Sequence, residues 1–544
     1  MNAITPRSVF SDRLMLDVNG NSELSASRFG HLTRERANEV FDLSKATLGN
    51  ELSVSDFWGN ETASMSKAVT QATGLTYYDL RAPALNLFPT ITPLRNRFAR
   101  KQRANPGTAL NYKTITSLAG SGFNWMGWVP EGTRAGAMTY TANNKSVSYV
   151  TIGEEDSLTD EAQFAAEGFE DEASMVQLRT LLKLMAKEEA GMLSGNATLA
   201  LGTPTAPTLA AAGTGATLPA LTYSVIVVAL SQAAFMHATL AGGVPSTVSI
   251  TPNGGGTPFV LNGGASMRSA SATQAITLGQ TLSATVPLIN GAVAYAWYVG
   301  GVGAETLQFI STINSATFAL PLAGARQAAT VIAADYSVNA GLAYDGFLTT
   351  AFLNAPSTGS YVLALPTGVA GAGTQLTSSG YGSVVEVDTM LKTMWDTYRV
   401  SPTVIYVSSQ EQRSISKLSM VGSGSAPLIR YNIDEGNANV QGVAGNVISF
   451  YFNPYSPEGG TKIPVKIHPN IAPGTIMAVC ETLPPWYVQN ETPAVAEVLT
   501  RKDYYTEAWQ KVTRRQDYGI YCQSALAIYA PFAVAVITNI APTT

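Results

Sequence analysis

Cysteine, histidine and charged residues are all scarce in this chain of 544 residues. The two cysteines, Cys480 and Cys522, are far apart in the sequence, which excludes a disulfide scaffold and fits a reducing compartment. Charged residues make up 13% of the chain, whereas typical soluble domains contain about 25%. Much of the surface is therefore expected to be uncharged. Such a surface suits a protein that is covered by copies of itself, although a Thr- and Ala-rich β protein of ordinary solubility would have the same composition.

The sequence also has no long apolar run. A membrane-spanning helix needs about 20 apolar residues, and the nearest candidate, Ala525 to Ile540, is shorter and contains Pro531. The segment from Met1 to Phe10 lacks the apolar core of a secretory signal. We therefore expect neither a signal peptide nor a membrane partner.

Motifs for catalysis and cofactor binding are missing. The histidines His31, His237 and His468 are isolated, and no Gly-x-Ser-x-Gly segment frames a nucleophile. The sequence contains no His-x-x-x-His or Cys-x-x-Cys pair of the kind that holds zinc. It also contains no complete glycine loop for a nucleotide. We therefore predict a protein that is not an enzyme and that has no catalytic residues, cofactor or metal.

The densest basic segment lies before residue 104, in a chain whose net charge is −5. Its members are Arg95, Arg97, Arg100, Lys101 and Arg103. One interpretation is a solvated, flexible segment. The other is an arm that contacts an acidic neighbour or packaged nucleic acid. Because tight phosphate binding needs more clustered Lys and Arg than this, no sequence-specific nucleic-acid site is expected.

Carboxylates cluster before a predicted long helix. The clustered residues are Glu154, Glu155, Asp156, Asp160 and Glu161, followed by Glu170, Asp171 and Glu172. Clustered oxygens can bind a divalent cation, but no Asp-x-Asp-x-Asp-Gly loop is present. Favourable negative charge at a helix N-terminus is the simpler interpretation, and we prefer it.

The length of the chain implies two to four domains. Its first 200 residues predict an arm, a hairpin and a helix. Residues 1–90 form an extended arm with one helix, capped by Thr33. Alternation over 108–116 and 139–152 predicts paired strands. A helix is expected from Glu170 to Leu193, where Gly195 and Asn196 end it. Its apolar stripe would consist of Met175, Leu178, Leu182, Met185 and Met192, interrupted by Glu189.

Between the paired strands lies an aromatic turn, Trp125 to Gly132. Trp125 and Trp128 can be core residues, or they can anchor a contact between subunits, where tryptophan is enriched. The surrounding glycines favour an exposed hairpin and therefore the contact.

The composition changes at Gly202. From 204 to 340 the charged residues are few, and strand-like runs recur at 222–230, 274–286, 293–299 and 317–320. This pattern predicts an inserted all-β sandwich with Trp297 in its core.

After residue 340 the pattern is mixed. Residues 387–398 predict a helix, 402–407 a strand, and Ser408 with Glu411 a capping box for a second helix. The segment 481–520 is extended and charged, and 520–540 predicts a strand that returns to a core. These elements indicate an α/β domain.

The order of three segments resembles the major capsid protein of tailed bacteriophages. The segments are Trp128-Val-Pro-Glu-Gly132, Thr151 to Asp160, and Leu193-Ser-Gly-Asn196. The resemblance implies an α+β phage major capsid fold with an inserted immunoglobulin-like domain. Its parts would be an N-terminal arm (1–90), an extended β-hairpin loop (91–155), a spine helix with the first part of the peripheral domain (156–203), the inserted immunoglobulin-like β sandwich (204–340), an axial domain (341–480), the second part of the peripheral domain (481–519) and a return strand of the axial domain (520–544).

The same resemblance implies a function. Copies of the chain would form pentamers and hexamers of an icosahedral virion head, assembled in the host cytoplasm around double-stranded DNA that is bound without sequence specificity. Decoration, portal or scaffolding proteins are possible partners. The candidate subunit contacts are Trp125, Trp128, Glu131, Arg97 and Arg100. The alternatives are an encapsulin-like bacterial nanocompartment and a surface adhesin with immunoglobulin-like domains.

Some members of this family cross-link their subunits through a loop lysine. Lys113 and Lys145 lie in the corresponding region, but neither aligns with that role. No autocatalysis is therefore predicted.

Overall fold

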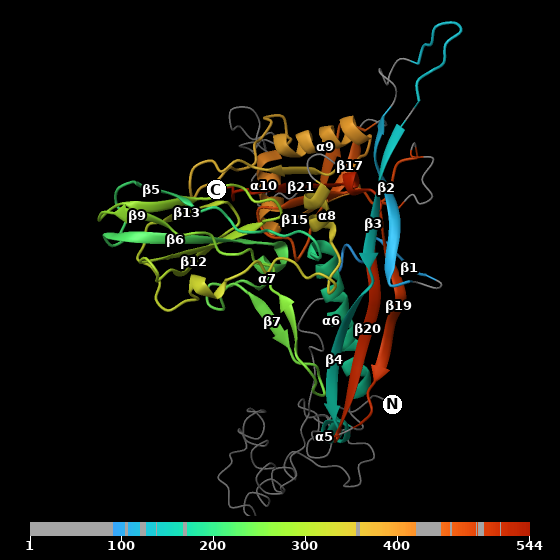
Figure 1. Cartoon of the computed structure of the whole chain (residues 1–544), viewed down its shortest axis with the longest axis horizontal. Helices are drawn as coiled ribbons and strands as arrows, with labels where there is room; N and C mark the ends of the chain where they lie inside the picture. Colours follow the sequence, from blue (N-terminus) through green and yellow to red (C-terminus); the bar gives the residue numbers. More distant parts are fainter. Residues whose placement is uncertain are drawn as a thin grey trace, which may run out of the picture. The chain divides into compact units, whose positions relative to one another are not determined.

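The computed structural model describes one of two units of the chain. Clustering separates Met1–Pro89 from Thr90–Thr544. The described residues are 91–103, 107–119, 127–137, 139–166, 171–354, 359–419, 448–456, 460–485, 487, 494–511 and 513–543. The predicted N-terminal arm and Trp125 lie outside them. The described ranges contain both helices and long runs of strands, so the fold is α+β, as predicted (Figure 1).

A four-stranded sheet carries the long helix. Its order is β1-β19-β20-β4, with β1 (Ala99–Gln102), β19 (Ala496–Ala508), β20 (Arg515–Ile528) and β4 (Val150–Thr159). β1 pairs with β19 in parallel, and the other pairs are antiparallel. A short helix, α5 (Asp160–Ala166), follows β4, and α6 (Glu172–Ser194) packs on β4 and β20 (Figure 1).

The ends of α6 confirm the predicted helix to within two residues. Asp171 is the N-cap, and its side chain accepts a hydrogen bond from the backbone N–H of Ser174. Gly195 follows the last helical residue. A Cβ atom at this position would lie 2.4 Å from the carbonyl oxygen of Tyr344, so the close approach of another segment requires glycine here.

The predicted stripe of α6 is correct at Met192, which is fully buried, and wrong at Leu178, which is 47% exposed. The buried residues also include Val176, Thr180 and Leu184, together with Glu188. These four follow a spacing of four, but two of them are polar. A stripe built from apolar residues alone therefore misses part of the contact face.

A separate hairpin consists of β2 (Ala109–Ala119) and β3 (Thr139–Ser148), which pair antiparallel. This confirms the predicted paired strands. Within the predicted loop 91–155, β1 and β4 belong to the four-stranded sheet. Val150 is buried in the central core, which explains why the chain leaves the hairpin there.

The segment 204–340 contains a three-stranded sheet, β13-β10-β5, and a four-stranded sheet, β12-β11-β6-β9. We call this segment the β module. Its elements are β5 (Thr208–Ala212), β6 (Leu221–Leu230), α7 (Gln232–His237), β7 (Thr247–Ile250), β8 (Phe259–Asn262), β9 (Ala272–Ile276), β10 (Thr281–Thr285), β11 (Ala294–Gly300), β12 (Thr306–Ser311), β13 (Ser315–Phe318) and η1 (Ala329–Val331). Trp297 is fully buried in a core formed by residues of both sheets, as the sequence predicts. The immunoglobulin-like character of the module stays a prediction.

The two ends of the β module lie side by side. The backbone N–H of Gly202 donates to the Asp335 carboxylate at 2.8 Å, and the N–H of Leu201 donates to the Ser337 hydroxyl at 2.9 Å. A segment that enters and leaves at one place has the geometry of an insertion.

The module is also fixed to the rest of the chain by buried polar contacts. The backbone N–H of Asn314 donates to Asn539 Oδ1 at 2.8 Å, and Asn539 Nδ2 donates to the carbonyl of Leu365 at 2.7 Å. Asn539 has a positive φ of 61°. A deletion of 204–340 would remove Asn314 and so leave Asn539 with its bond to Leu365 but without its partner in the β module.

A six-stranded mixed sheet, β14-β21-β18-β15-β17-β16, forms the α/β region that the sequence predicts. Its strands are β14 (Tyr361–Ala364), β15 (Val404–Val407), β16 (Phe450–Asn453), β17 (Thr461–Ile467), β18 (Ile476–Val479) and β21 (Val534–Thr538). The accompanying helices are α8 (Phe347–Asn354), α9 (Val385–Tyr398) and α10 (Ser409–Ser419). The predicted helix at 387–398 and the strand at 402–407 are both confirmed.

The predicted capping box of α10 has a different geometry. The Ser408 hydroxyl donates to the Glu411 carboxylate. Glu411 also accepts the backbone N–H of Gly474 at 2.9 Å. The carboxylate therefore joins the start of the helix to the loop before β18, and does not only cap its own helix.

The apolar run from 520 to 540 is two strands and not one. β20 ends at Ile528, a 3-10 turn, η3, spans Pro531–Ala533, and β21 begins at Val534 in the other sheet. Pro531 cannot donate a ladder hydrogen bond, so the chain changes sheets at this residue.

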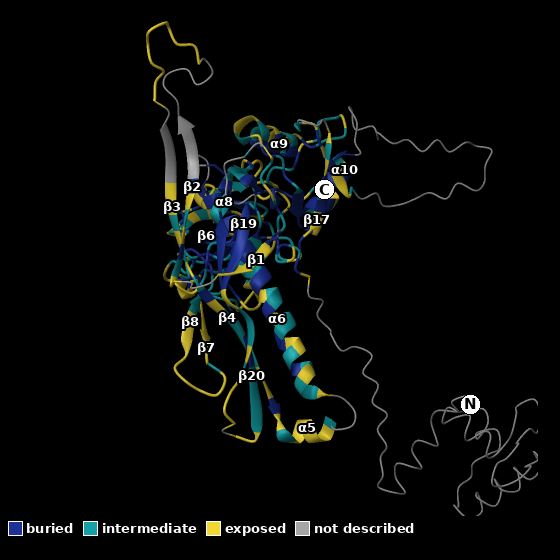
Figure 2. Cartoon of the chain, turned by 90° about the vertical axis from the view of Figure 1, so that its right-hand side faces the viewer, coloured by how far each residue is buried: buried dark blue, intermediate teal, exposed yellow. Residues whose placement is uncertain are grey.

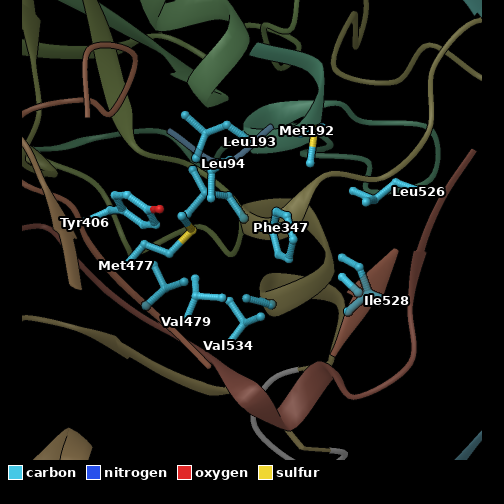
Figure 3. Close-up of a cluster of buried hydrophobic side chains, with 14 of the residues drawn as sticks. Leu94, Met192, Leu193, Phe347, Tyr406, Met477, Val479, Leu526, Ile528 and Val534 are labelled. Carbon is cyan, nitrogen blue, oxygen red and sulfur yellow. The ribbon is translucent and has the colours of Figure 1, made fainter. Parts of the chain in front are cut away.

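One hydrophobic core connects these parts. It contains Leu94, Met192 and Phe347 together with Met477 of β18 and Leu526 of β20 (Figure 3). Residues from the start of the described chain, from α6 and from both large sheets therefore pack on each other.

The buried Trp297 gives a test of the β-module core. Its indole N–H donates to Ser311 at 2.8 Å. We expect Trp297→Ala to destabilise the module by about 3–5 kcal/mol, because the substitution leaves a large cavity and removes the buried hydrogen bond to Ser311. Hydrogen exchange of the β6 and β11 amides measures the change. Leu278→Ala, at a residue that is 78% exposed, is the control and should leave the exchange within about 0.5 kcal/mol of wild type.

Candidate functional site: an exposed hairpin tip and the ionic junction of α6

The turn that contains Trp128 is exposed throughout. Every residue of 127–137 is exposed (Figure 2), and Trp128 itself is 85% exposed. The backbone N–H of Thr133 donates to the carbonyl of Pro130 at 3.1 Å. Gly132 has a φ of 79°, the left-handed conformation that this type of turn requires of its third residue. A glycine-dependent turn therefore presents a tryptophan to the surroundings.

The base of the β2–β3 hairpin is attached to the four-stranded sheet. Leu110 is buried with Leu499 and Ala527. The rings of Tyr112 and Tyr529 meet edge to face, with 5.3 Å between their centroids. A two-stranded ribbon is at best marginally stable in water without such a contact. The base fixes the direction of the hairpin, whereas the tip residues 127–137 have no such cover within the described part of the chain.

An ionic junction anchors α6 to the strands beside the hairpin. Glu188 is 1% exposed, and its carboxylate accepts a hydrogen bond from Arg95 Nε at 3.1 Å. Arg100 and the Tyr504 hydroxyl also donate to it. The two guanidinium groups lie over the Tyr504 ring, at 5.2 and 4.8 Å from its centroid, a cation–π geometry.

Arg100 has a second partner in the junction. Its Nη2 donates to Asp503 at 2.6 Å. Burial acts to lower the pKa of Arg100, but the bond to Asp503 and the charge of Glu188 outweigh it and raise the pKa above its ordinary value. Burial also raises the pKa of the neighbouring Cys522 thiol to about 11. Arg100 is therefore held as a cation, while Cys522 stays a neutral thiol at pH 7.

Glu189, the next residue of α6, has a separate set of partners. Its carboxylate accepts the backbone N–H groups of Leu94 and Arg95, both at 2.8 Å. It also lies 2.8 Å from His468 Nε2, and both side chains are fully buried. The backbone N–H of Asn470 donates to His468 Nδ1 at 3.1 Å, which assigns the ring proton to Nε2. The Glu–His pair is closed to solvent, and its role is to position α6.

The structure shows the partners of the basic segment. Arg97 pairs with Glu481, Arg100 pairs with Glu188 and Asp503, and Lys101 pairs with Glu497 at 2.5 Å. The acidic partners of these cations belong to the same chain. Arg97 and Arg100 are largely covered, which does not fit a solvated segment, whereas Lys101 is 55% exposed and does fit it. That Arg97 and Arg100 contact another subunit stays a prediction, as it does for the exposed Glu131.

The clustered acidic residues before α6 lie in different elements. Glu154 lies in β4 and pairs with Lys183 and Lys187 of α6, so this cluster holds the helix on the sheet and does not lie at a helix N-terminus. Asp160 and Glu161 do lie in the first turn of α5, as expected. No cluster of three or more His, Cys, Asp or Glu side chains that suits a metal ion was found in the described ranges. None of the described helices is long and apolar enough to cross a membrane.

Comparison with known proteins gives similarities of structure alone. No family model matches the sequence, and no curated protein matches it. The capsid of a native GTA particle is 8% identical with a TM-score of 0.41, covering 88% of this chain and 100% of that one. The capsid of Myoviridae phage XM1 is 9% identical with a TM-score of 0.35, covering 86% and 100%. The SrpI encapsulin from Synechococcus elongatus PCC 7942 is 7% identical with a TM-score of 0.36, covering 88% and 96%.

The chain is similar to capsid and encapsulin shell proteins. Phage capsids and encapsulins are the two classes that the sequence resemblance names. Each TM-score is below 0.5, so these similarities assign no function to the chain.

The ionic junction gives a test of what holds α6. We expect Glu188→Gln to destabilise the chain by about 3–5 kcal/mol, because two guanidinium groups would lose their buried countercharge. Asp396→Asn removes the exposed pair with Lys392 and should change stability by at most about 1 kcal/mol. Urea denaturation followed by tryptophan fluorescence measures both. Equal effects of the two substitutions would contradict this role of Glu188.

The ion pairs that hold α6 also predict that the free energy of unfolding falls in acid. Burial acts to raise the pKa of Glu154, but Lys183 and Lys187 outweigh it and lower the pKa. The pKa of Asp503 is lowered in the same way, by Arg100 against burial. Because the folded pKa values are depressed, this stability is complete above the ordinary carboxyl pKa of about 4 and is lost as the pH falls through the folded values.

Calorimetry between pH 6 and pH 3, a range of about one to two units on either side of the ordinary value, measures this loss. Glu154→Gln should decline less steeply with acidification than wild type. An unchanged slope in this variant would show that Glu154 is not responsible.

Proposed function

We propose that this chain is a major capsid protein whose copies form pentamers and hexamers of an icosahedral head that encloses double-stranded DNA. The observation that carries the proposal is the β2–β3 hairpin, whose base is fixed by Leu110 and whose tip exposes Trp128. Tryptophan is enriched among the residues that anchor interfaces. The low charge of the chain, at 13%, suits surfaces that become covered.

In this proposal the parts have separate roles. The four-stranded sheet with α6 is the peripheral domain and its spine helix. The six-stranded sheet is the axial domain, and the β module is an insertion with an outward-facing role. The tip of the hairpin lies on the next copy around a ring that closes by rotation, in a capsid assembled in the host cytoplasm.

The proposed enclosure of DNA does not depend on the basic segment. Arg95, Arg97, Arg100 and Lys101 have carboxylate partners in the same chain. Neutralised cations contribute little to counterion release on phosphate binding. The proposal is therefore one of enclosure without sequence-specific contacts. An encapsulin-like compartment is the second candidate. The same hairpin supports it, and so do the carboxylate partners of the basic segment, because a compartment needs no DNA-binding surface.

Trp128 tests the proposed assembly. We expect Trp128→Ala to reduce the yield of particles at least about tenfold, the effect of truncating an interface anchor. The folded monomer should be unchanged, since the side chain is 85% exposed. Tyr381→Ala is a matched control, because Tyr381 is an aromatic residue that is 89% exposed on a different loop.

Negative-stain microscopy and light scattering measure the particles. Wild-type chain that stays monomeric at high concentration would overturn the proposal. Nuclease-protected DNA in particles from infected cells separates a virion from a compartment.

A further inference from the structure

A second hairpin, in the β module, presents an apolar face that the described part of the chain does not cover. β7 and β8 form a two-stranded sheet of their own. Val248 pairs with Leu261, and Ile250 pairs with Phe259. Directly paired residues point to the same face, and so do residues two apart on a strand. These four side chains therefore share one face, which we call the ribbon face.

Three of the four side chains of the ribbon face are exposed, and Leu261 is partly buried. Val248 is 47% exposed, Ile250 36% and Phe259 44%. No third strand pairs with β7 or β8 within the described residues, and an unpaired strand edge can pair with a further strand. An exposed apolar ribbon of this kind marks an interaction surface or an aggregation hazard.

The ribbon is held in place at both ends. At its base the backbone N–H of Asn262 donates to Asn339 Oδ1 at 2.8 Å, and Asn339 Nδ2 donates back to the Asn262 carbonyl at 2.9 Å. At its tip Arg515, the first residue of β20, donates to Asn253 Oδ1 at 3.3 Å. The ribbon therefore joins the β module to the start of β20 (Figures 1 and 2).

The chemistry of the ribbon restricts its partner. Residues 238–267 contain no Asp, Glu, Lys or Arg. Nucleic acid needs clustered cations, so a phosphate backbone is not the occupant. A neutral, apolar surface with free strand edges matches another surface of the same composition, and in a self-assembling shell every subunit is flanked by copies of itself.

We propose that the ribbon face is a contact surface for a second copy of this chain, distinct from the β2–β3 hairpin. This inference rests on the proposed function. It assigns to the β module a part in assembly, so that the insertion links neighbouring subunits as well as decorating the surface.

Photo-crosslinking of the full chain tests the contact directly. A benzoyl-phenylalanine replaces Phe259 in one sample, and in a matched control it replaces Leu278, which is 78% exposed in the turn between β9 and β10. Each sample is a mixture of ¹⁴N and ¹⁵N protein. We expect crosslinked peptides of mixed isotope at 259 and few at 278.

The outcomes separate the two proposals. Particles with only single-isotope crosslinks at 259 would overturn the ribbon contact and leave the shell function standing. Mixed-isotope crosslinks without particles would support the ribbon contact and overturn the shell. Monomers without mixed crosslinks would overturn both.

Substitution gives a second measurement. Ile250→Thr with Phe259→Ser should lower the particle yield at least about tenfold, while keeping residues that strands tolerate. Leu278→Ser with Val302→Ser is the matched control, because both residues are exposed in turns of the same module, and it should assemble as wild type. Thermal denaturation of the monomers confirms that both variants fold. A double variant that folds and assembles like wild type would contradict the contact.

Discussion

The structure depends on two adjacent buried carboxylates in one helix. Glu188 and Glu189 lie on the contact face of α6 and are almost fully buried. Burying an unpaired charge would cost several kcal/mol, so α6 can lie on its sheet only where countercharges and donors surround both groups. Arg95, Arg100 and Tyr504 supply them for Glu188, and backbone amides with His468 supply them for Glu189. The segment before β1, the long sheet and the loop after β17 are therefore all positioned against one turn of a helix.

Several of the few charged residues of this chain pair within it. The charges of the junction hold α6, and Glu154 holds it again through two lysines. In the β module Glu305 accepts a hydrogen bond from the Ser224 hydroxyl at 2.5 Å, and Asp335 accepts one from the backbone N–H of Gly202 at the start of the module. The hairpin tip exposes Glu131 and Arg134, whereas the ribbon face has no charged residue. Association at the ribbon face would rely on apolar burial, which depends little on salt.

Much of the fold follows from local sequence signals. The bounds of α6 follow from Asp171 and the glycine at 195, the β2–β3 pairing from alternation, and the burial of Trp297 from its place in an apolar strand. The exposure of Trp128 follows from the glycines around it. The wrong predictions share one cause, since each concerns a contact between distant segments. The apolar stripe of α6 missed part of the contact face because Thr180 and Glu188 are buried by partners that lie elsewhere in the chain, and the last apolar run was read as one strand because its two halves enter different sheets.

The amino-acid sequence by itself determined which segments are helix, strand or turn, because hydrophobic periodicity, caps and glycines act over a few residues. It also determined the low charge content of the chain, which composition fixes. Only the tertiary structure decided which charged and polar groups pair. Arg100 and Glu188 are 88 residues apart, and Asn253 and Arg515 are 262 apart, so no local rule pairs them. Their pairing is decided by the burial of α6 and by the path of the β module.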